Sequence, residues 1–149
     1  MRREPMVLFT SRRAFLFAIL FSAQFLVRTI LDWFMPTLDF HTRATVSTFV
    51  SAAILLAAGF SAAWRSDSFS AGAVSGVVTA GVAAIISVTG AVILLMVWHD
   101  PETMAAIRGS GGLEEVFSLP VMMILPGVVL GSVGGVACIG IKRVFPDLS

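Results

Sequence analysis

Cysteine, lysine, tyrosine and charge are all scarce in this sequence. Cys138 is the only cysteine among 149 residues, which excludes an internal disulfide framework and a redox CxxC pair. Lys142 is the only lysine, tyrosine is absent, and charged residues make up 13% of the chain, about half of the share typical of soluble domains. The net charge is +1, so no strongly basic surface for a nucleic acid is expected.

Apolar residues take the place of the missing charge. Hydrophobic residues make up 57% of the chain, and its mean hydropathy is +0.94. This composition predicts an all-α integral membrane protein, and the length suits a single domain over residues 1–149. Four runs reach the roughly 20 apolar residues that a spanning helix needs, at 14–34, 45–64, 71–98 and 119–141. We therefore expect four transmembrane helices in an up-down bundle.

Tryptophan and the basic residues orient these spans. Trp33, Trp64 and Trp98 stand at the ends of the first three runs, where indole rings form an interfacial belt. Arg43 and Arg108 lie on one side of the membrane. The other side holds more basic residues, namely Arg2, Arg3, Arg12, Arg13, Arg65, Lys142 and Arg143. The positive-inside rule therefore predicts that both termini are cytoplasmic.

The first run carries a polar stripe. Gln24, Arg28 and Asp32 recur every four residues and so share one face of a helix. Lipid cannot satisfy these groups, so this face is predicted to pack against protein, with Arg28 paired to Asp32 near the outer interface and Gln24 deeper. The run is too long for a signal peptide, and Phe21 stands where cleavage needs a small residue. We expect an uncleaved anchor.

Small residues form two seams of the glycine-zipper type. The seam in the third run consists of Gly72, Gly76, Thr79, Ala83 and Gly90. The seam in the fourth run consists of Gly127, Gly131 and Gly135, at exact spacings of four. Such positions let two helix backbones approach closely. Two alternatives follow: the seams pack within one chain, or one of them is an interface with another copy or a larger partner.

Prolines and polar residues interrupt the apolar runs in the second half of the chain. Pro126 lies inside the fourth run, where it removes a hydrogen bond to the Met122 carbonyl and is expected to kink the helix. The connection at 99–118 contains a good helix start, with Asp100 as N-cap and Pro101 in the first turn. We expect a short surface helix from Pro101 to Arg108 on the outer side, either as a contact site for a partner or as a simple connection.

The sequence offers little catalytic chemistry. His99, Asp100, Glu102, Asp39 and His41 are expected on the outer side, but their spacing matches no strong metal-ligand pattern. No serine or cysteine has an evident activating base, and no phosphate-binding loop is present. No titratable group lies in the middle of a span, as a proton-coupled transporter would need. We therefore expect no catalytic residue, no metal and no cofactor.

Two functions remain open at this point. The first is a structural, accessory or interaction subunit that acts by contact, with the lipid bilayer, other copies of itself or a larger membrane complex as its partners and no nucleic acid among them. The alternative is a small oligomeric channel or transporter that uses the stripe of Gln24, Arg28 and Asp32. The preference for arginine over lysine is typical of a GC-rich bacterial genome, which together with the spans predicts a multi-pass inner-membrane protein.

Overall fold

The computed structural model describes residues 4–35, 40–109 and 112–145, and these residues form helices and no strand. Three residues used above, Arg2, Arg3 and Asp39, lie outside these ranges. Four segments are long and apolar enough to cross a membrane: Arg12–Phe34, His41–Ser66, Phe69–Val97 and Val116–Val144. The composition therefore predicted the fold class correctly at this level: all-helical, with four candidate spans.

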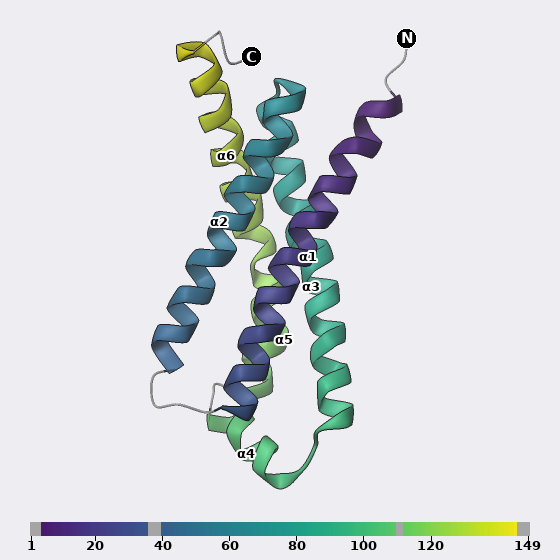
Figure 1. Ribbon diagram of the computed structural model, residues 1–149, viewed down its shortest axis with the longest axis vertical. Helices are drawn as coiled ribbons and strands as arrows, with labels where there is room; N and C mark the ends of the chain where they lie inside the picture. The colour runs from purple at the N-terminus through teal and green to yellow at the C-terminus, as the bar shows by residue number, and fades with distance from the viewer. Residues whose placement is uncertain (1–3, 36–39, 110–111, 146–149) are drawn as a thin grey trace.

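The first three spans are single helices, α1 (Glu4–Phe34), α2 (Phe40–Ser66) and α3 (Phe69–Val97). Figure 1 shows the chain passing along the long axis of the molecule in alternating directions, with both termini at the same end. The connection between α2 and α3 is tight because Asp67 adopts a left-handed conformation, with φ of 50°. Aspartate tolerates this region better than most residues. The Asp67 N–H donates to the Ala63 carbonyl, 3.0 Å away.

The fourth span is broken into two helices, α5 (Gly112–Met122) and α6 (Ile124–Val144). The break at Met123 has a simple cause, because Pro126 has no N–H to donate to the Met122 carbonyl. The expected kink is therefore a change of helix just before the proline. The fourth span also begins earlier than the hydropathy indicated, so that Pro120 lies inside α5 rather than near a helix start.

Glycines bring α6 against α3 at backbone distance. A Cβ added to Gly131 would lie 2.5 Å from the Gly72 carbonyl oxygen and 2.9 Å from the Gly76 Cα, and one added to Gly127 would lie 2.9 Å from both the Gly76 oxygen and the Ala80 Cβ. No side chain fits between these helices. The first part of the α3 seam, Gly72 and Gly76, thus meets the α6 seam within one chain. The rest of the α3 seam faces α1 instead, because Thr79 donates to the Ala14 carbonyl and a Cβ on Gly90 would meet the Leu26 side chain.

A second glycine contact joins α6 to α2. A Cβ on Gly59 would strike the backbone of Gly131, and one on Gly134 would lie 2.9 Å from the Phe60 nitrogen. α6 therefore packs between α2 and α3, while α1 packs on α3 and α2. The centre of the bundle is built from three alanines and two larger apolar side chains, namely Ala18, Phe21, Leu55, Ala80 and Ala83.

The end of the bundle at which α1 and α3 finish, named the outer end after the orientation that the sequence predicts, is covered by α4 (Pro101–Gly109). Figure 1 shows α4 lying across this end. Asp100 caps this helix, because its Oδ1 accepts from the backbone N–H groups of Glu102 at 3.1 Å and Thr103 at 3.0 Å. Ile107 and Thr103 face inward and are buried. The helix extends one residue beyond the predicted stop at Arg108, to Gly109.

Candidate functional site

The polar stripe of α1 contacts α2 through its deepest member. The amide nitrogen of Gln24 donates to the Ser51 hydroxyl at 2.7 Å, and the Ser47 hydroxyl donates to the Gln24 amide oxygen at 3.1 Å. Ser47 and Ser51 are one helical turn apart, so both fall on the face that α2 turns toward α1. Both ends of the amide are thereby satisfied within the chain, as apolar surroundings demand.

Asp32 sits between two arginines at the outer end of the same stripe. The Arg28 Nε lies 3.2 Å from Asp32 Oδ2, and Arg43 Nη1, from α2, lies 3.4 Å from Asp32 Oδ1. The Arg28 side chain is 10% exposed and Asp32 is 8% exposed, so neither faces the lipid side of α1. The arrangement combines a local pair on one helix with a cross-link to the next.

Arg43 also closes the end of α1. Its Nη1 donates to the carbonyl oxygens of Leu31 at 3.0 Å and Met35 at 2.9 Å. The Leu31 carbonyl also accepts from the Met35 N–H, so Arg43 adds a side-chain donor to the last turn of α1. A cation at a helix C-terminus also interacts favourably with the helix dipole. No sequence pattern indicated this role, because Arg43 could be counted only as a charge on the outer side.

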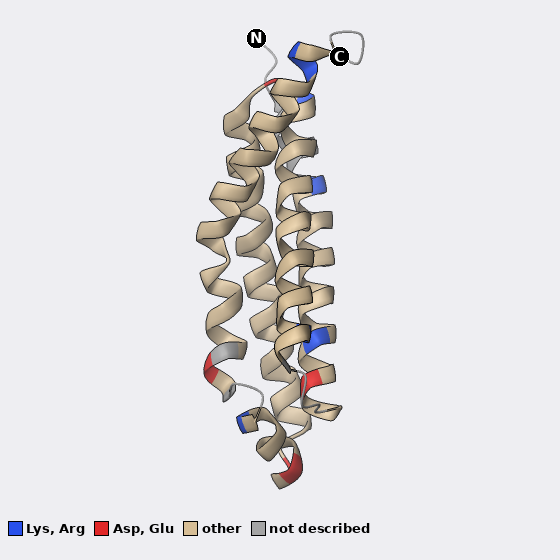
Figure 2. Cartoon of the chain, turned by 90° about the vertical axis from the view of Figure 1, so that its left-hand side faces the viewer, with Lys and Arg blue, Asp and Glu red and all other residues tan. Residues whose placement is uncertain are grey.

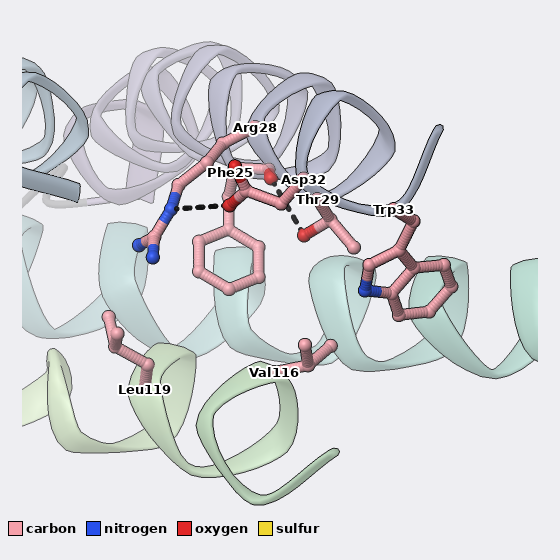
Figure 3. A pocket seen from close by; sticks show the side chains of 7 residues that line it. All are labelled: Phe25, Arg28, Thr29, Asp32, Trp33, Val116 and Leu119. Carbon is pink, nitrogen blue, oxygen red and sulfur yellow. Dashed lines mark hydrogen bonds and ion pairs between the residues drawn. The ribbon is translucent and has the colours of Figure 1, made fainter. Parts of the chain in front are cut away.

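A small cavity lies beside the Arg28–Asp32 pair, between α1 and α5 (Figure 3). Its volume is about 20 Å³, which is room for about one water molecule. In Figure 3 the Arg28, Thr29 and Trp33 side chains point from α1 toward Val116 and Leu119 of α5. The α1 wall therefore combines polar side chains with the aromatic rings of Phe25 and Trp33, while the α5 wall is apolar. The space is too small for any organic substrate.

The three tryptophans have different surroundings. Trp33 is 2% exposed, so its ring belongs to the interior at the outer end rather than to an exposed belt. Trp98 is 43% exposed and stands edge-on to Phe34, with ring centroids 5.4 Å apart. Trp64 stacks on Phe60. Trp64 and Trp98 thus keep the partial exposure that a headgroup-layer ring needs.

The opposite end of the bundle has its own polar contact, formed by Lys142 of α6. Its Nζ donates to the Trp64 carbonyl oxygen at 2.6 Å and to Asp67 Oδ1 at 2.5 Å, and it lies 5.1 Å from the centre of the Trp64 ring. This one side chain caps the last turn of α2 and ties it to α6.

Hydroxyl groups inside the bundle mostly bond to carbonyl oxygens. Ser22 donates to Ala18 at 2.7 Å, Ser75 to Ala58 at 3.2 Å, and Thr79 to Ala14 at 3.3 Å. Ser87 is the one fully buried side-chain polar atom without a partner among the described residues. The Ser22–Ala18 bond lies within α1, but Ser22 also donates to the Ala83 carbonyl of α3 at 3.3 Å, and the other two bonds likewise join helices. Buried Phe21 and Leu55 lie in the same interior, so the hydroxyls do not line an open path.

No family model matches this chain, and neither does any curated protein or solved structure. The assignment of a function must therefore come from the residues themselves.

The outer acidic and histidine residues do not converge within the described ranges. No group of three or more His, Cys, Asp or Glu side chains there is placed to hold a metal ion, and Asp39 lies outside those ranges. Asp100 is committed to capping α4. The Thr103 N–H and hydroxyl bond its carboxylate and lower the pKa of Asp100 below its ordinary value of 3.8.

The apolar surface contains one groove that no sequence pattern indicated. It has a volume of about 690 Å³ and lies between α3 and the break that separates α5 from α6, with Gly81, Ile85 and Thr89 on one side and Val121 and Ile124 on the other. The groove exists because the chain changes helix at Met123. Nothing in the chain approaches within 4 Å of a Cβ built on Gly81.

Proposed function

We propose that this protein is a multi-pass protein of the bacterial inner membrane, with cytoplasmic termini, that acts by contact as a structural or accessory subunit and catalyses no reaction. The observation that carries the proposal is the Gln24 amide, held at both ends by Ser47 and Ser51. A deep polar group in a membrane helix usually marks a path for an ion or a substrate. Here both polar atoms of the Gln24 amide form hydrogen bonds that join α1 to α2.

The other polar residues of the spans support the same reading. Arg28 is bonded to Asp32, which Arg43 also contacts from α2. The glycines of α3 and α6 likewise pack within the chain, because Gly127 and Gly131 contact Gly72 and Gly76. The outward faces of the spanning helices carry large apolar side chains, such as Phe49 on α2. Such a surface suits lipid and the helices of another membrane protein.

Site-specific cross-linking in native membranes tests this proposal. A diazirine-bearing residue replaces one exposed residue on each spanning face in turn: Leu20, Phe49, Ile85 or Val133. A contact subunit should give a discrete protein adduct of one mass from one or two adjacent faces. Buried Leu55 is the control position, because a reagent there meets only its own chain. Lipid adducts alone at all four exposed positions would contradict the proposal.

A second candidate function is a small oligomeric channel, and the cavity beside Arg28 is the observation that favours it. In that case Arg28 would attract anions near an outer vestibule. Reconstitution into liposomes tests this function directly, with halide, fluoride, formate and small cations as permeants. A channel should show a flux that Arg28→Ala reduces, whereas equal leakage from protein-containing and protein-free liposomes would exclude it.

A further inference from the structure

Basic residues gather at the end of the bundle where α1 begins and α6 ends, while the opposite end carries residues of both signs (Figure 2). Five described basic residues belong to the first end: Arg12, Arg13, Arg65, Lys142 and Arg143. The carboxylate of that end among the described side chains is Asp67, and it bonds to Lys142. The end as a whole is therefore electropositive where the spans leave the apolar zone.

Two of these arginines belong to the neighbouring helices α1 and α2, which pack on each other. Arg13 is exposed, and its Nη1 donates to the Ser61 hydroxyl on α2 at 3.3 Å. Arg65 is also exposed and stands four residues after Ser61, which places it one turn further along the same face of α2. The Arg13 side chain is therefore held on the same face of α2 that carries Arg65.

The depth of these two arginines matches the phosphate layer of a bilayer. Arg13 is the second residue of the apolar segment Arg12–Phe34, and Arg65 is the last but one of His41–Ser66. Trp64, a residue type that settles at the headgroup level, is adjacent to Arg65. Arginine is suited to phosphate because its planar donors bind two oxygens at once.

We propose that Arg13 and Arg65 bind the phosphate of an anionic phospholipid from the cytoplasmic leaflet, across the contact between α1 and α2. Charge complementarity selects the ligand, because basic patches between spanning helices on the cytoplasmic side attract anionic headgroups. The inference rests on the membrane orientation given under the proposed function but not on any protein partner. Lipid binding and partner cross-linking are measured separately, so either can fail alone.

A lipid titration tests the proposal. The purified protein is placed in phosphatidylcholine nanodiscs with increasing mole fractions of phosphatidylglycerol, and its thermal unfolding is followed. The wild type should rise in Tm and saturate. Losing a direct hydrogen bond to a charged group costs at least about 1.5 kcal/mol, so Arg13→Gln or Arg65→Gln should raise the half-saturating fraction at least about tenfold.

The matched control is Arg143→Gln, which removes the same charge from an exposed residue at the same end but on α6. It should bind like the wild type. An equal loss in this control would show that only the general charge of the end matters and would overturn the proposal. An equal Tm rise with inorganic phosphate in pure phosphatidylcholine would overturn it in favour of a free-anion site.

Lysine variants keep the experiment decisive if the glutamine variants fold poorly. Arg13→Lys and Arg65→Lys retain the charge but lose the two-oxygen fork. Each should weaken phosphatidylglycerol binding at least twofold in the same titration. Lysine variants that bind as tightly as the wild type would overturn the assignment of these two side chains as the phosphate ligands.

Discussion

The crossing point at Gly131 is where α6 meets two other helices, and it gives the sharpest prediction. Gly131→Ala would place a methyl group 2.5 Å from the Gly72 carbonyl oxygen, 2.9 Å from the Gly76 Cα and 3.2 Å from the Gly76 nitrogen. Every one of these atoms belongs to backbone, so no side chain can rotate away. Gly59 of α2 also packs against the Gly131 backbone, so α6 cannot simply move off α3.

The size of the effect follows from two opposing contributions. Reaching an ordinary contact of 3.4 Å from 2.5 Å requires α3 and α6 to separate by 0.9 Å. Overpacking of this kind costs about 3 kcal/mol at the upper end of its usual range. Replacing glycine by alanine inside a helix returns about 1 kcal/mol. We therefore expect Gly131→Ala to lower the free energy of unfolding by about 2 kcal/mol.

Gly140→Ala is the matched control on the same helix. Nothing lies within 4 Å of a Cβ built on Gly140, so only the gain of about 1 kcal/mol remains and this variant should be more stable than the wild type. Reversible unfolding in mixed micelles with increasing denaturing detergent measures both variants. Equal stability of the two variants, or a gain for Gly131→Ala, would refute the close backbone packing of α6.

Three further predictions concern polar contacts. Gln24→Leu should cost about 1 kcal/mol of unfolding free energy, the usual worth of a hydrogen bond between spanning helices, in the same unfolding assay; an unchanged midpoint would contradict its role between α1 and α2. The pKa of Asp100 is lowered in the fold, so its capping contribution is complete above pH 3.8 and is lost as the pH falls through the folded pKa. The protection factor of the Thr103 amide, which compares its exchange with that of an unfolded peptide at the same pH, should therefore fall on acidification in the wild type. In Asp100→Ala it should be low and less dependent on this titration. Lys142→Met should speed exchange in the last turn of α2, near Trp64, and leave its first turn unchanged; equal exchange at both ends would argue against the cap.

The existence of the four spans could be predicted from sequence because each is a property of local composition. Hydropathy located them to within a few residues at most ends, and it failed where proline chemistry intervenes. Pro126 correctly indicated a disturbance, but hydropathy alone continued the helix through Met123 and started it near Leu119 instead of Gly112. A helix break arises from a missing backbone hydrogen bond, and hydropathy averaged over side chains carries no information about backbone hydrogen bonds.

The partners within the site could not be predicted because they depend on which helices meet. The spacing of Gln24, Arg28 and Asp32 indicated a face that must avoid lipid, and the i,i+4 relation was enough to expect the Arg28–Asp32 pair. Nothing in the spacing linked Gln24 to Ser47 and Ser51. Each of those residues fits several bundle arrangements equally well.

The same limit applies to Arg43 and to the glycines. In the sequence, a basic residue in a short connection indicates only the orientation of the spans. Arg43 can cap α1 only when α2 packs beside the end of α1. Gly59 stood alone among alanines and belonged to no repeat, yet its backbone contact with Gly131 is as close as those of the glycine seams. Periodicity detects rows of small residues and misses a single crossing point.

The contrast between Arg28 and Gln24 has a consequence for how the chain enters the bilayer. Arg28 finds Asp32 on its own helix, so α1 carries this neutralised pair from the moment it is made. Gln24 bonds to Ser47 and Ser51 of α2. The cap on the end of α1 also comes from α2, because Arg43 provides it. The first span is therefore an incomplete membrane segment until the second is synthesised, and the two should leave the insertion machinery together, as a helical hairpin.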